Sequence, residues 1–362
     1  MKILLITNMY PTKKDPAYGV FIKNICSGLT NQGCSVKLIT IYGRPGNYLL
    51  KLVKYVILYL KILFINFKDY DFVYLSYPSH TYIPCLFRRI ETNKVIVRLH
   101  GTDLIPVSKS TLSKFMQKVV FKCVQRARLI VVPSTYFKNI LIDLLNKSNI
   151  HLESSKIFIN PSGGVNHEIL YPVRSDAHDF QIGYIGRFDK TKGTRVLLRA
   201  IKHLEFPYKL IMVGDGPEKK YIINYIKSNN LSEKIILYKE QPQEILGQFY
   251  NLFSVFVFPT LRKQESLGNV AIEALSCGVP VIGSNIAAVK DYIKEDYNGY
   301  LFEPDNSAKL SERLNMFYNL PREKKNQLKD NARRSVVKYS SQKVSLDFYN
   351  KLQEISIAND RM

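Results

Sequence analysis

The chain has 362 residues, of which 46% are hydrophobic and 23% charged, and its formal net charge is +22 at pH 7. A chain of this length exceeds the size at which one hydrophobic core usually stops growing, so we expect two domains. The five cysteines are scattered and the six histidines show no ligand spacing, which excludes a disulfide scaffold and a structural zinc site. We therefore expect reduced thiols in a cytoplasmic protein.

The positive charge is concentrated in the first half of the chain. Residues 1–165 contain 23 Lys and Arg against 7 Asp and Glu, a net charge of +16, whereas residues 166–362 contain 29 against 23, a net charge of +6. Such a surface attracts anionic partners. Nucleic acid is one alternative, but nothing resembles a recognition helix or an aromatic RNA-binding strand, so we expect no nucleic-acid partner.

Short apolar runs alternate with helical patterns along the chain, which predicts an α/β fold with parallel sheets. The first run, Ile3–Ile6, is too short for a signal-peptide core. We expect strands near residues 2–7, 35–41, 72–77, 94–99, 129–132 and 156–159. A second series is expected near 181–185, 208–213, 234–237, 254–258 and 279–282.

Between the two series lies a candidate linker. It begins at Asn160 with proline and glycines and continues as a polar stretch to Asp179, so it breaks regular structure and carries little apolar surface. Two doubly wound domains in tandem are therefore predicted, with a ligand at the carboxyl ends of the strands.

Two helical segments in the first half, residues 48–68 and residues 110–128, carry cations without any acidic residue. Residues 48–68 resemble a membrane span, but lysines interrupt them and no uncharged run approaches the ~20 residues that a span needs. Each segment alone is typical of a core helix with a solvated lysine face. Two such helices together favour contact with anionic lipid headgroups, where each cation contributes ~1 kcal/mol. We therefore expect peripheral membrane attachment through Lys51, Lys54, Lys61, Lys114, Lys118, Lys122 and Arg126.

A basic loop follows the expected strand at 181–185. It contains Arg187 and Lys192 and opens a helix, which is where phosphates bind in α/β folds. Arginine can fork onto phosphate oxygens and lysine adds a point charge, although such a loop by itself is typical of a solvated turn. The turn Gly214–Pro217 has its proline at a first helical position, and we interpret it as structural.

The most informative segment follows the expected strand at 254–258. Glu265 lies in a loop, and Gly268 begins the helix that contains Glu273. Carboxylates accept hydrogen bonds from sugar and ribose hydroxyls. The backbone amides of Leu267 and Gly268, together with the cations of the basic loop, suit a diphosphate. A nucleotide sugar has these parts in this order, so the segment predicts a nucleotide-sugar site.

Three features of the first half bear on the same site. His100 follows the strand at 94–99 and can face a cleft, although a lone histidine is usually a satisfied polar residue. Gly19 would let a backbone amide approach a phosphate or sugar. Asp69-Tyr70-Asp71 has the spelling of a metal-binding motif of sugar transferases, but it directly precedes a strand. We interpret it as a turn and expect no metal.

With these residues in place, the chain resembles the retaining glycosyltransferases of family 4 over nearly its whole length. The first loop has one glycine where many members have two, and the hinge ends in Asn166 where aspartate is common. The resemblance is carried by Tyr18–Phe21, His100–Asp103, Pro161–Asn166, Gly186–Gly193, Gly214–Pro217, Glu265–Glu273 and Gly278–Ile282.

The resemblance implies the GT-B fold, with two Rossmann-like doubly wound domains facing each other across a cleft. The implied boundaries are 1–165 for an acceptor and membrane domain and 166–340 for a donor domain, with the helix at about 341–357 packed back on the first. It implies a retaining, metal-independent hexosyl transfer that needs no cofactor besides the donor. We expect a UDP-sugar as the donor, with a GDP-sugar as the alternative.

The resemblance also implies a role for each site residue. Arg187 and Lys192 neutralise the donor diphosphate as it departs. Glu265 holds the donor sugar, with the Leu267 and Gly268 amides nearby, and Glu273 holds the ribose. His100 contacts the sugar near the reacting carbon, and Gly19 lies beside the donor phosphates.

The basic first half suggests a lipid-linked saccharide as acceptor, at the inner face of the plasma membrane. Assembly of bacterial O-antigen (lipopolysaccharide), capsule or exopolysaccharide fits this expectation best. A sugar-nucleotide epimerase or a phosphorylase on the same scaffold is an alternative, as is a basic nucleic-acid-binding protein. The combination of the Arg187–Lys192 loop with Glu265 and Glu273 favours the transferase.

Overall fold

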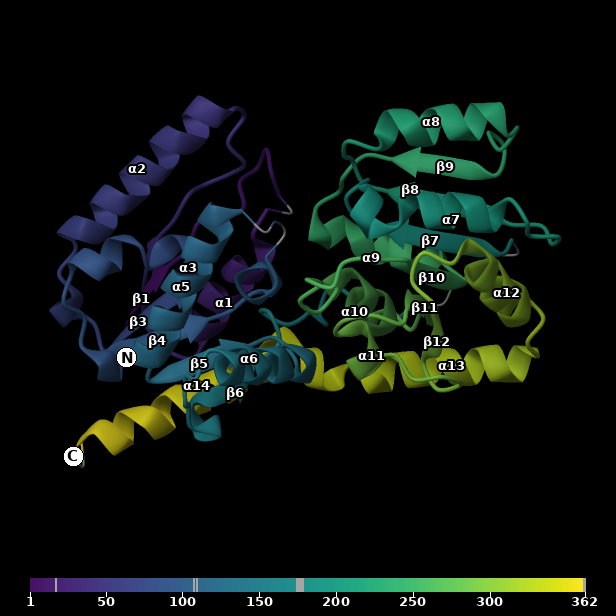
Figure 1. The fold of residues 1–362 in the computed structure, drawn as a ribbon. Helices are drawn as coiled ribbons and strands as arrows, with labels where there is room; N and C mark the ends of the chain where they lie inside the picture. Colours follow the sequence, from purple (N-terminus) through teal and green to yellow (C-terminus); the bar gives the residue numbers. More distant parts are fainter. Residues whose placement is uncertain (17, 107, 109, 174–178, 361–362) are drawn as a thin grey trace. The chain divides into compact units, whose positions relative to one another are not determined.

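The computed structural model describes residues 1–16, 18–106, 108, 110–173 and 179–360 (Figure 1). The chain forms two compact units, one made of Met1–Gly164 with Ser341–Met362 and the other of Val165–Ser340. Each unit contains one parallel sheet of six strands. Residues 174–178 of the expected linker lie outside the described residues.

The first unit is a doubly wound α/β unit in which the strand order is β2-β1-β3-β4-β5-β6. Successive strands are added on one side of β1 up to β2 and on the other side from β3 onward, so a topological switch point lies between β1 and β3. The strands are β1 (Lys2–Ile6), β2 (Ser35–Ile39), β3 (Phe72–Ser76), β4 (Val95–Arg98), β5 (Leu129–Val132) and β6 (Ile157–Ile159). The helices are α1 (Val20–Asn31), α2 (Tyr48–Phe64), α3 (Pro78–Thr81), α4 (Gly101–Leu104), α5 (Thr111–Arg126), α6 (Thr135–Lys147) and α14 (Ser341–Asp360), with short 3-10 turns at Phe67–Asp69, Pro84–Phe87, Thr92–Lys94 and Ser154–Lys156.

Both faces of this sheet are covered, because successive side chains of a strand point to opposite sides. Ile3 and Leu5 of β1 lie in a core with residues of α1 and α14. Leu4 and Ile6 lie in a core with residues of α2, α5 and α6 on the other face. The strands therefore consist of nearly uninterrupted apolar residues.

The last helix, α14, is an integral part of the first unit. The fully buried Arg98 guanidinium donates to the Tyr74 hydroxyl and to both the backbone carbonyl and the side chain of Asn160. The Asn160 amide donates in turn to the Val344 carbonyl of α14, at 2.9 Å. Gly28 of α1 packs so closely that a Cβ there would lie 1.9 Å from Ser345 Oγ. Only glycine allows this contact.

The second unit repeats the architecture with the order β12-β11-β10-β7-β8-β9. Its switch point lies between β7 and β10. The strands are β7 (Gln181–Ile185), β8 (Lys209–Val213), β9 (Ile235–Tyr238), β10 (Val255–Phe258), β11 (Val281–Ser284) and β12 (Gly299–Phe302). The helices are α7 (Thr194–Ile201), α8 (Lys219–Ser228), α9 (Gln243–Leu252), α10 (Asn269–Ser276), α11 (Val289–Tyr292), α12 (Ser307–Tyr318) and α13 (Arg322–Ser335), with 3-10 turns at Lys190–Lys192 and Val337–Tyr339.

The α/β fold with parallel sheets is confirmed, and each of the eleven expected strands is present within two residues of its expected bounds. The strand β12 was not expected. It is a four-residue edge strand entered through Asn298-Gly299, a dipeptide typical of turns. A Cβ on Gly299 would lie 2.0 Å from the Val281 carbonyl oxygen, so the glycine serves close strand pairing.

Helix α2 departs from the core-helix pattern. Only Leu58 and Ile62 are buried, whereas Leu49 is 68% exposed. By contrast, α5 buries Val119 and Val120 and exposes its lysines, as a core helix does. Among the described residues, no helix is both long and apolar enough to cross a bilayer. The exposed apolar residues of α2 are Tyr48, Leu49, Leu50, Leu52, Val53, Val56, Ile57, Leu60 and Phe64.

Candidate active site

Two loops meet at the switch point of the second unit. One follows β7 and contains Arg187 and Lys192, and the other follows β10 and contains Glu265. Gly193 has a φ of 73°, and a Cβ there would lie 1.8 Å from the Pro259 carbonyl oxygen. The Leu261 amide donates to the Thr191 carbonyl at 2.8 Å. The two loops are therefore in direct contact at the carboxyl ends of the strands, where α/β folds bind ligands.

This contact brings Lys192 and Glu265 together. Lys192 Nζ donates to Glu265 Oε2 at 2.6 Å, and Thr260 Oγ1 donates to the same oxygen at 3.1 Å. Burial raises the pKa of Glu265, but the nearby cations Lys192 and Arg262 outweigh burial and hold it below its ordinary value. Glu265 is therefore an ionised carboxylate at neutral pH, next to a positive charge that is itself only partly exposed.

The loop that carries Arg187 is held in place by the turn Gly214–Pro217. The Phe188 amide donates to the Asp215 carbonyl at 2.9 Å, and a Cβ on Gly214 would lie 2.0 Å from the Gly186 carbonyl oxygen. The turn thus supports the basic loop, in agreement with its structural interpretation. The Arg187 side chain itself is exposed to solvent.

Glu273 lies in the second turn of α10 and is only 6% exposed. Tyr250 donates its hydroxyl to Oε2 and Gln243 donates its amide to Oε1, each at 2.8 Å. Burial raises the pKa of Glu273, because water no longer solvates the charged form. Each carboxylate oxygen can still accept a further hydrogen bond from a ligand hydroxyl.

The start of α10 is shaped by Gly268, which has a φ of 74° and precedes the first helical residue. A Cβ there would lie 2.7 Å from the Phe258 ring and 2.9 Å from the Tyr292 hydroxyl. That hydroxyl is buried and has no hydrogen-bond partner among the described residues. Leu267, next to Gly268, is buried. The Gly268 backbone and the unsatisfied Tyr292 hydroxyl therefore lie close together. Burial, together with the charge of Glu265, raises the pKa of Tyr292.

Sequence reasoning missed four residues of this arrangement: Gln243, Tyr250, Arg262 and Tyr292. Gln243 and Tyr250 stand on α9 and Tyr292 stands on α11, so these three approach Glu265 and Glu273 only through the tertiary fold, whereas Arg262 lies in the same loop as Glu265. The single signal in the sequence was the position of Arg262, three residues before Glu265.

In the first unit, His100 is 3% exposed and precedes the first residue of α4. Its Nε2 is 2.9 Å from Ser76 Oγ, and its ring stacks on Tyr77 with 3.9 Å between ring centroids. Burial, helped by Arg98, lowers the pKa of His100 well below its ordinary value, so the imidazole is neutral at pH 7. Gly19 has a φ of 81° and precedes α1, where a Cβ would crowd the Met9 backbone at 3.2 Å.

The cations expected to face a membrane occupy different environments. Lys51 and Lys61 of α2 are exposed, as are Lys114, Lys118, Lys122 and Arg126 of α5. The Lys54 amine instead turns to the backbone and donates to the Tyr42 carbonyl at 2.7 Å. In the Asp69-Tyr70-Asp71 segment, Asp71 accepts from the Lys2 amide at 2.7 Å, directly before β3. It is a turn, as interpreted from the sequence.

Comparison with known proteins decides the family. The family model described as glycosyl transferases group 1 matches residues 168–335, which contain both loops of the site. An uncharacterised glycosyltransferase of Methanocaldococcus jannaschii is 30% identical over 262 residues, which are 72% of this chain and 68% of that protein. The chain belongs to the group 1 glycosyltransferases.

The chain is also similar to a Campylobacter jejuni enzyme, N-acetylgalactosamine-N,N'-diacetylbacillosaminyl-diphospho-undecaprenol 4-alpha-N-acetylgalactosaminyltransferase. It is 25% identical over 255 residues, which are 68% of this chain and 66% of that enzyme. The matches therefore span about two thirds of the length of these two curated relatives.

Solved structures of glycosyltransferases share the fold. Sucrose-phosphate synthase from Thermosynechococcus elongatus matches with a TM-score of 0.79 at 19% identity, over 99% of each chain. Anabaena HepE in complex with UDP-glucose matches with a TM-score of 0.75 at 17% identity, over 98% of this chain and 100% of that one. The chain thus has the GT-B fold, with its two six-stranded parallel sheets.

Proposed function

We propose that the protein is a retaining glycosyltransferase that moves a hexosyl unit from a nucleotide sugar to a lipid-linked saccharide in bacterial surface-polysaccharide assembly. The observation that carries the proposal is the 2.6 Å contact between Lys192 and the ionised Glu265 at the switch point of the second unit. One group suits the diphosphate of such a donor and the other suits the hydroxyls of its sugar.

The remaining residues complete the donor site. Arg187 adds a second cation for the diphosphate, and the Leu267 and Gly268 amides lie at the start of α10, where the helix dipole favours negative charge. Glu273 accepts from the ribose hydroxyls, with Gln243 and Tyr250 holding its carboxylate in position. UDP-sugars are the preferred donors, and the UDP-glucose complex of the HepE neighbour supports this choice.

The reaction needs one bond to form and one to break at the same sugar carbon. The bond between that carbon and the leaving diphosphate breaks, and Arg187 and Lys192 stabilise the charge that develops on the diphosphate. The acceptor hydroxyl attacks from the same face, and its proton passes to a donor phosphate oxygen. The neutral His100 contacts the sugar as a hydrogen-bonding group, and Gly19 lies beside the phosphates. Charge neutralisation by side chains requires no metal.

The acceptor is proposed from two observations. The C. jejuni relative is named for an acceptor linked to diphospho-undecaprenol. The first unit exposes an apolar helix face on α2 and a row of cations on α5, which suit an anionic membrane surface. The protein would then work as a peripheral protein at the inner face of the plasma membrane.

The test combines donor selection with two variants. Thermal shifts with UDP, GDP and ADP, and then with their sugars, identify the donor. With that donor, Arg187→Ala and Lys192→Ala are each expected to lower kcat about a hundredfold or more, because each removes a stabiliser of the leaving group. Near-normal turnover in both variants would refute the assigned roles.

A sugar-nucleotide epimerase or phosphorylase predicts a different dependence on acceptor. A transferase releases free nucleoside diphosphate in proportion to added saccharide acceptor. An epimerase would convert the donor without releasing the nucleotide. Chromatography of the nucleotide products, with and without acceptor, separates these reactions.

A further inference from the structure

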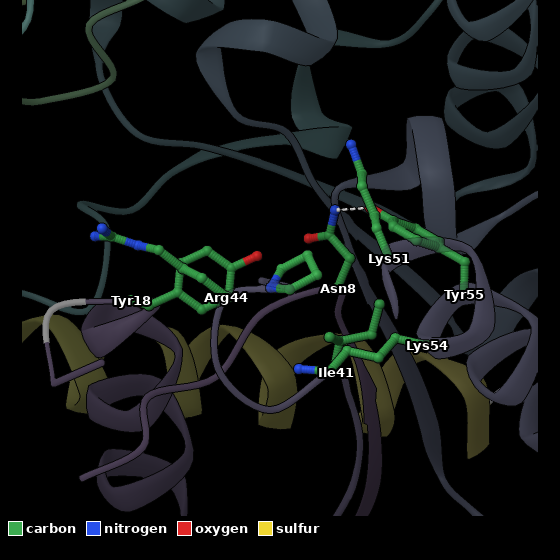
Figure 2. Close-up of a pocket in the computed structure, with 8 residues that line it drawn as sticks. Asn8, Tyr18, Ile41, Arg44, Lys51, Lys54 and Tyr55 are labelled. Atoms are coloured by element: carbon green, nitrogen blue, oxygen red, sulfur yellow. Dashed lines mark hydrogen bonds between the residues drawn. The ribbon is translucent and has the colours of Figure 1, made fainter. Parts of the chain in front are cut away.

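The first unit contains a pocket at the carboxyl end of β1, between the segment after β2 and helix α2 (Figure 2). Its volume is about 350 Å³. The lining residues that bear on its chemistry are Asn8, Tyr18, Arg44, Lys51, Lys54 and Tyr55. Three of them are cations, and the described lining includes no carboxylate. The pocket therefore suits an anionic ligand.

The wall of the pocket contains an unsatisfied hydrogen-bond acceptor. Asn8 is 7% exposed, and its amide donates to the Tyr55 hydroxyl at 3.0 Å. Its carbonyl oxygen points away from Tyr55, toward the side of Tyr18, and has no hydrogen-bond partner among the described residues (Figure 2). A buried acceptor left without a donor destabilises the folded protein, because the oxygen has lost its hydrogen bonds to water. A ligand hydroxyl in the pocket would satisfy this oxygen.

The three cations of the pocket make different contacts with the rest of the protein. The Lys54 amine donates to the carbonyls of Tyr42 and Gly43, at 2.7 Å and 3.4 Å, and so fixes the segment that carries Arg44. The Arg44 guanidinium lies 5.8 Å from the centre of the Tyr18 ring, and its backbone amide donates to Asp15 at 3.0 Å. Lys51 is exposed at the mouth of the pocket. Lys51 is thus the cation from which an entering anion gains most directly.

We propose that this pocket binds a phosphorylated saccharide, with a sugar hydroxyl donating to Asn8 Oδ1 and the phosphate or diphosphate beside Lys51. The proposal rests on the proposed function, because it makes the saccharide the acceptor, and it adds that the acceptor is recognised by its phosphate. Such a group occurs in a lipid-linked saccharide diphosphate and in a free sugar phosphate. The exposed apolar face of α2, the helix that also carries Lys51, favours the lipid-linked form.

The experiment measures binding to the full-length protein by calorimetry. The probes are a panel of hexose and N-acetylhexosamine 1-phosphates, the matching methyl glycosides, and inorganic phosphate. At least one sugar phosphate is expected to bind ten or more times tighter than its methyl glycoside and than inorganic phosphate. Equal affinity for a glycoside would overturn the phosphate assignment. Equal affinity for inorganic phosphate would overturn the saccharide assignment.

Two variants locate the binding in this pocket. Lys51→Ala is expected to weaken sugar phosphate binding about tenfold, since it removes a charge-assisted contact. The matched control is Lys37→Ala, which removes an exposed lysine of β2 outside the pocket and should change nothing. Asn8→Ala is expected to weaken sugar phosphates while leaving inorganic phosphate unaffected. Unchanged affinity in Lys51→Ala would overturn the proposal.

Two further measurements separate the sources and the hypotheses. The best sugar is presented on farnesyl diphosphate, in detergent and then on vesicles. Tighter binding than the free sugar phosphate identifies the lipid-linked form, whereas equal binding identifies the free sugar phosphate. UDP titration of the same samples tests the donor site separately. If UDP fails to bind while a sugar phosphate binds through Lys51, the proposed function fails and the pocket stands.

Discussion

The contact between Lys192 and Glu265 joins two groups that the proposed donor would use separately. Each neutralises the other while no donor is bound, which lets the fold keep both charges in a largely buried place. A diphosphate would compete for the lysine, and sugar hydroxyls would replace it at the carboxylate. The same pair thereby stabilises the empty site and prepares it for the ligand.

The two carboxylates of the site are expected to respond to pH in opposite directions. The pKa of Glu265 is lowered, so its contribution to stability is present above about pH 4.5 and lost as the pH falls through the folded pKa. The pKa of Glu273 is raised, so its contribution is present at low pH and lost as the pH rises through the folded pKa.

Thermal melts of Glu265→Gln and Glu273→Gln, each compared with the unmodified protein between pH 3.5 and 7, measure this difference. Raising the pH should make Glu265→Gln relatively less stable and Glu273→Gln relatively more stable. Parallel curves for the two variants would contradict the assignment. The comparison with the unmodified protein cancels the titration of all other groups.

At the scale of single residues, the sequence identified the charged residues of the site but not the residues that hydrogen-bond to them. The spacing of Glu265 and Glu273 is a local pattern, and it placed both correctly on a loop and a helix. Gln243 and Tyr250 belong to another helix, and their distance from Glu273 in the chain leaves no periodic signal. Tyr292 comes beside Gly268 only because α11 packs there.

Helix α2 exposes most of its apolar side chains, because neighbouring elements cover only a small part of it. Leu49, Val53, Val56 and Leu60 recur at helical spacing and share one face, and all four are exposed. An apolar stripe flanked by lysines is typical of a helix that lies in the interface of an anionic membrane. The pattern of lysines alone suggested the charged face as the contact, whereas burial points to the apolar stripe.

We expect the triple variant Leu49→Ser, Val56→Ser and Leu60→Ser to lose at least tenfold in binding to anionic vesicles. Each change removes apolar area that the bilayer would bury, at about 25 cal/mol per Å². The fold should persist, because these side chains are already exposed. Flotation with anionic vesicles at low salt is the measurement.

The matched control removes three exposed aliphatic side chains from the second unit: Ile223→Ser, Leu252→Ser and Val337→Ser. It should float like the unmodified protein. Equal loss in both triple variants, or an unmodified protein that stays in the soluble fraction, would rule out α2 as the contact.

At the scale of elements, the positions of the strands were easier to predict from the sequence than the solvent exposure of the helices. Eleven strands carry short, largely apolar runs of the kind that pack in a sheet covered on both faces, and these strands were expected correctly. The edge strand β12 is entered through the turn dipeptide Asn298-Gly299, and this local signal argues against a strand there. The exposure of α2 depends on the absence of a partner, which its own residues cannot reveal.

On the scale of the whole molecule, each unit has its own cores, and the second unit contains the expected donor residues other than Gly19 and His100. Loss of one unit should therefore leave local functions of the other measurable. The link between Arg98, Asn160 and Val344 offers a way to test this independence, because all three residues belong to the first unit.

Asn160→Ala is expected to destabilise the first unit by about 1–3 kcal/mol, since it removes the side-chain oxygen that accepts from the buried Arg98 guanidinium and the amide that donates to Val344. Calorimetric melting should show a lower transition for that unit, while UDP still binds the second. The control Asn146→Ala removes an exposed amide from α6 and should leave both unchanged. A variant with unaltered melting would show that the Arg98 contacts contribute little.

The first unit is assembled from both ends of the chain, since Phe348, Leu352 and Ile355 of α14 lie in one core with Ile3 and Leu5. During synthesis on a ribosome, the first 164 residues emerge long before these three side chains exist. The first unit therefore cannot complete its core until α14 has been translated, and part of its apolar interior stays uncovered until then. The usual order, in which the amino-terminal domain matures first, is thereby reversed.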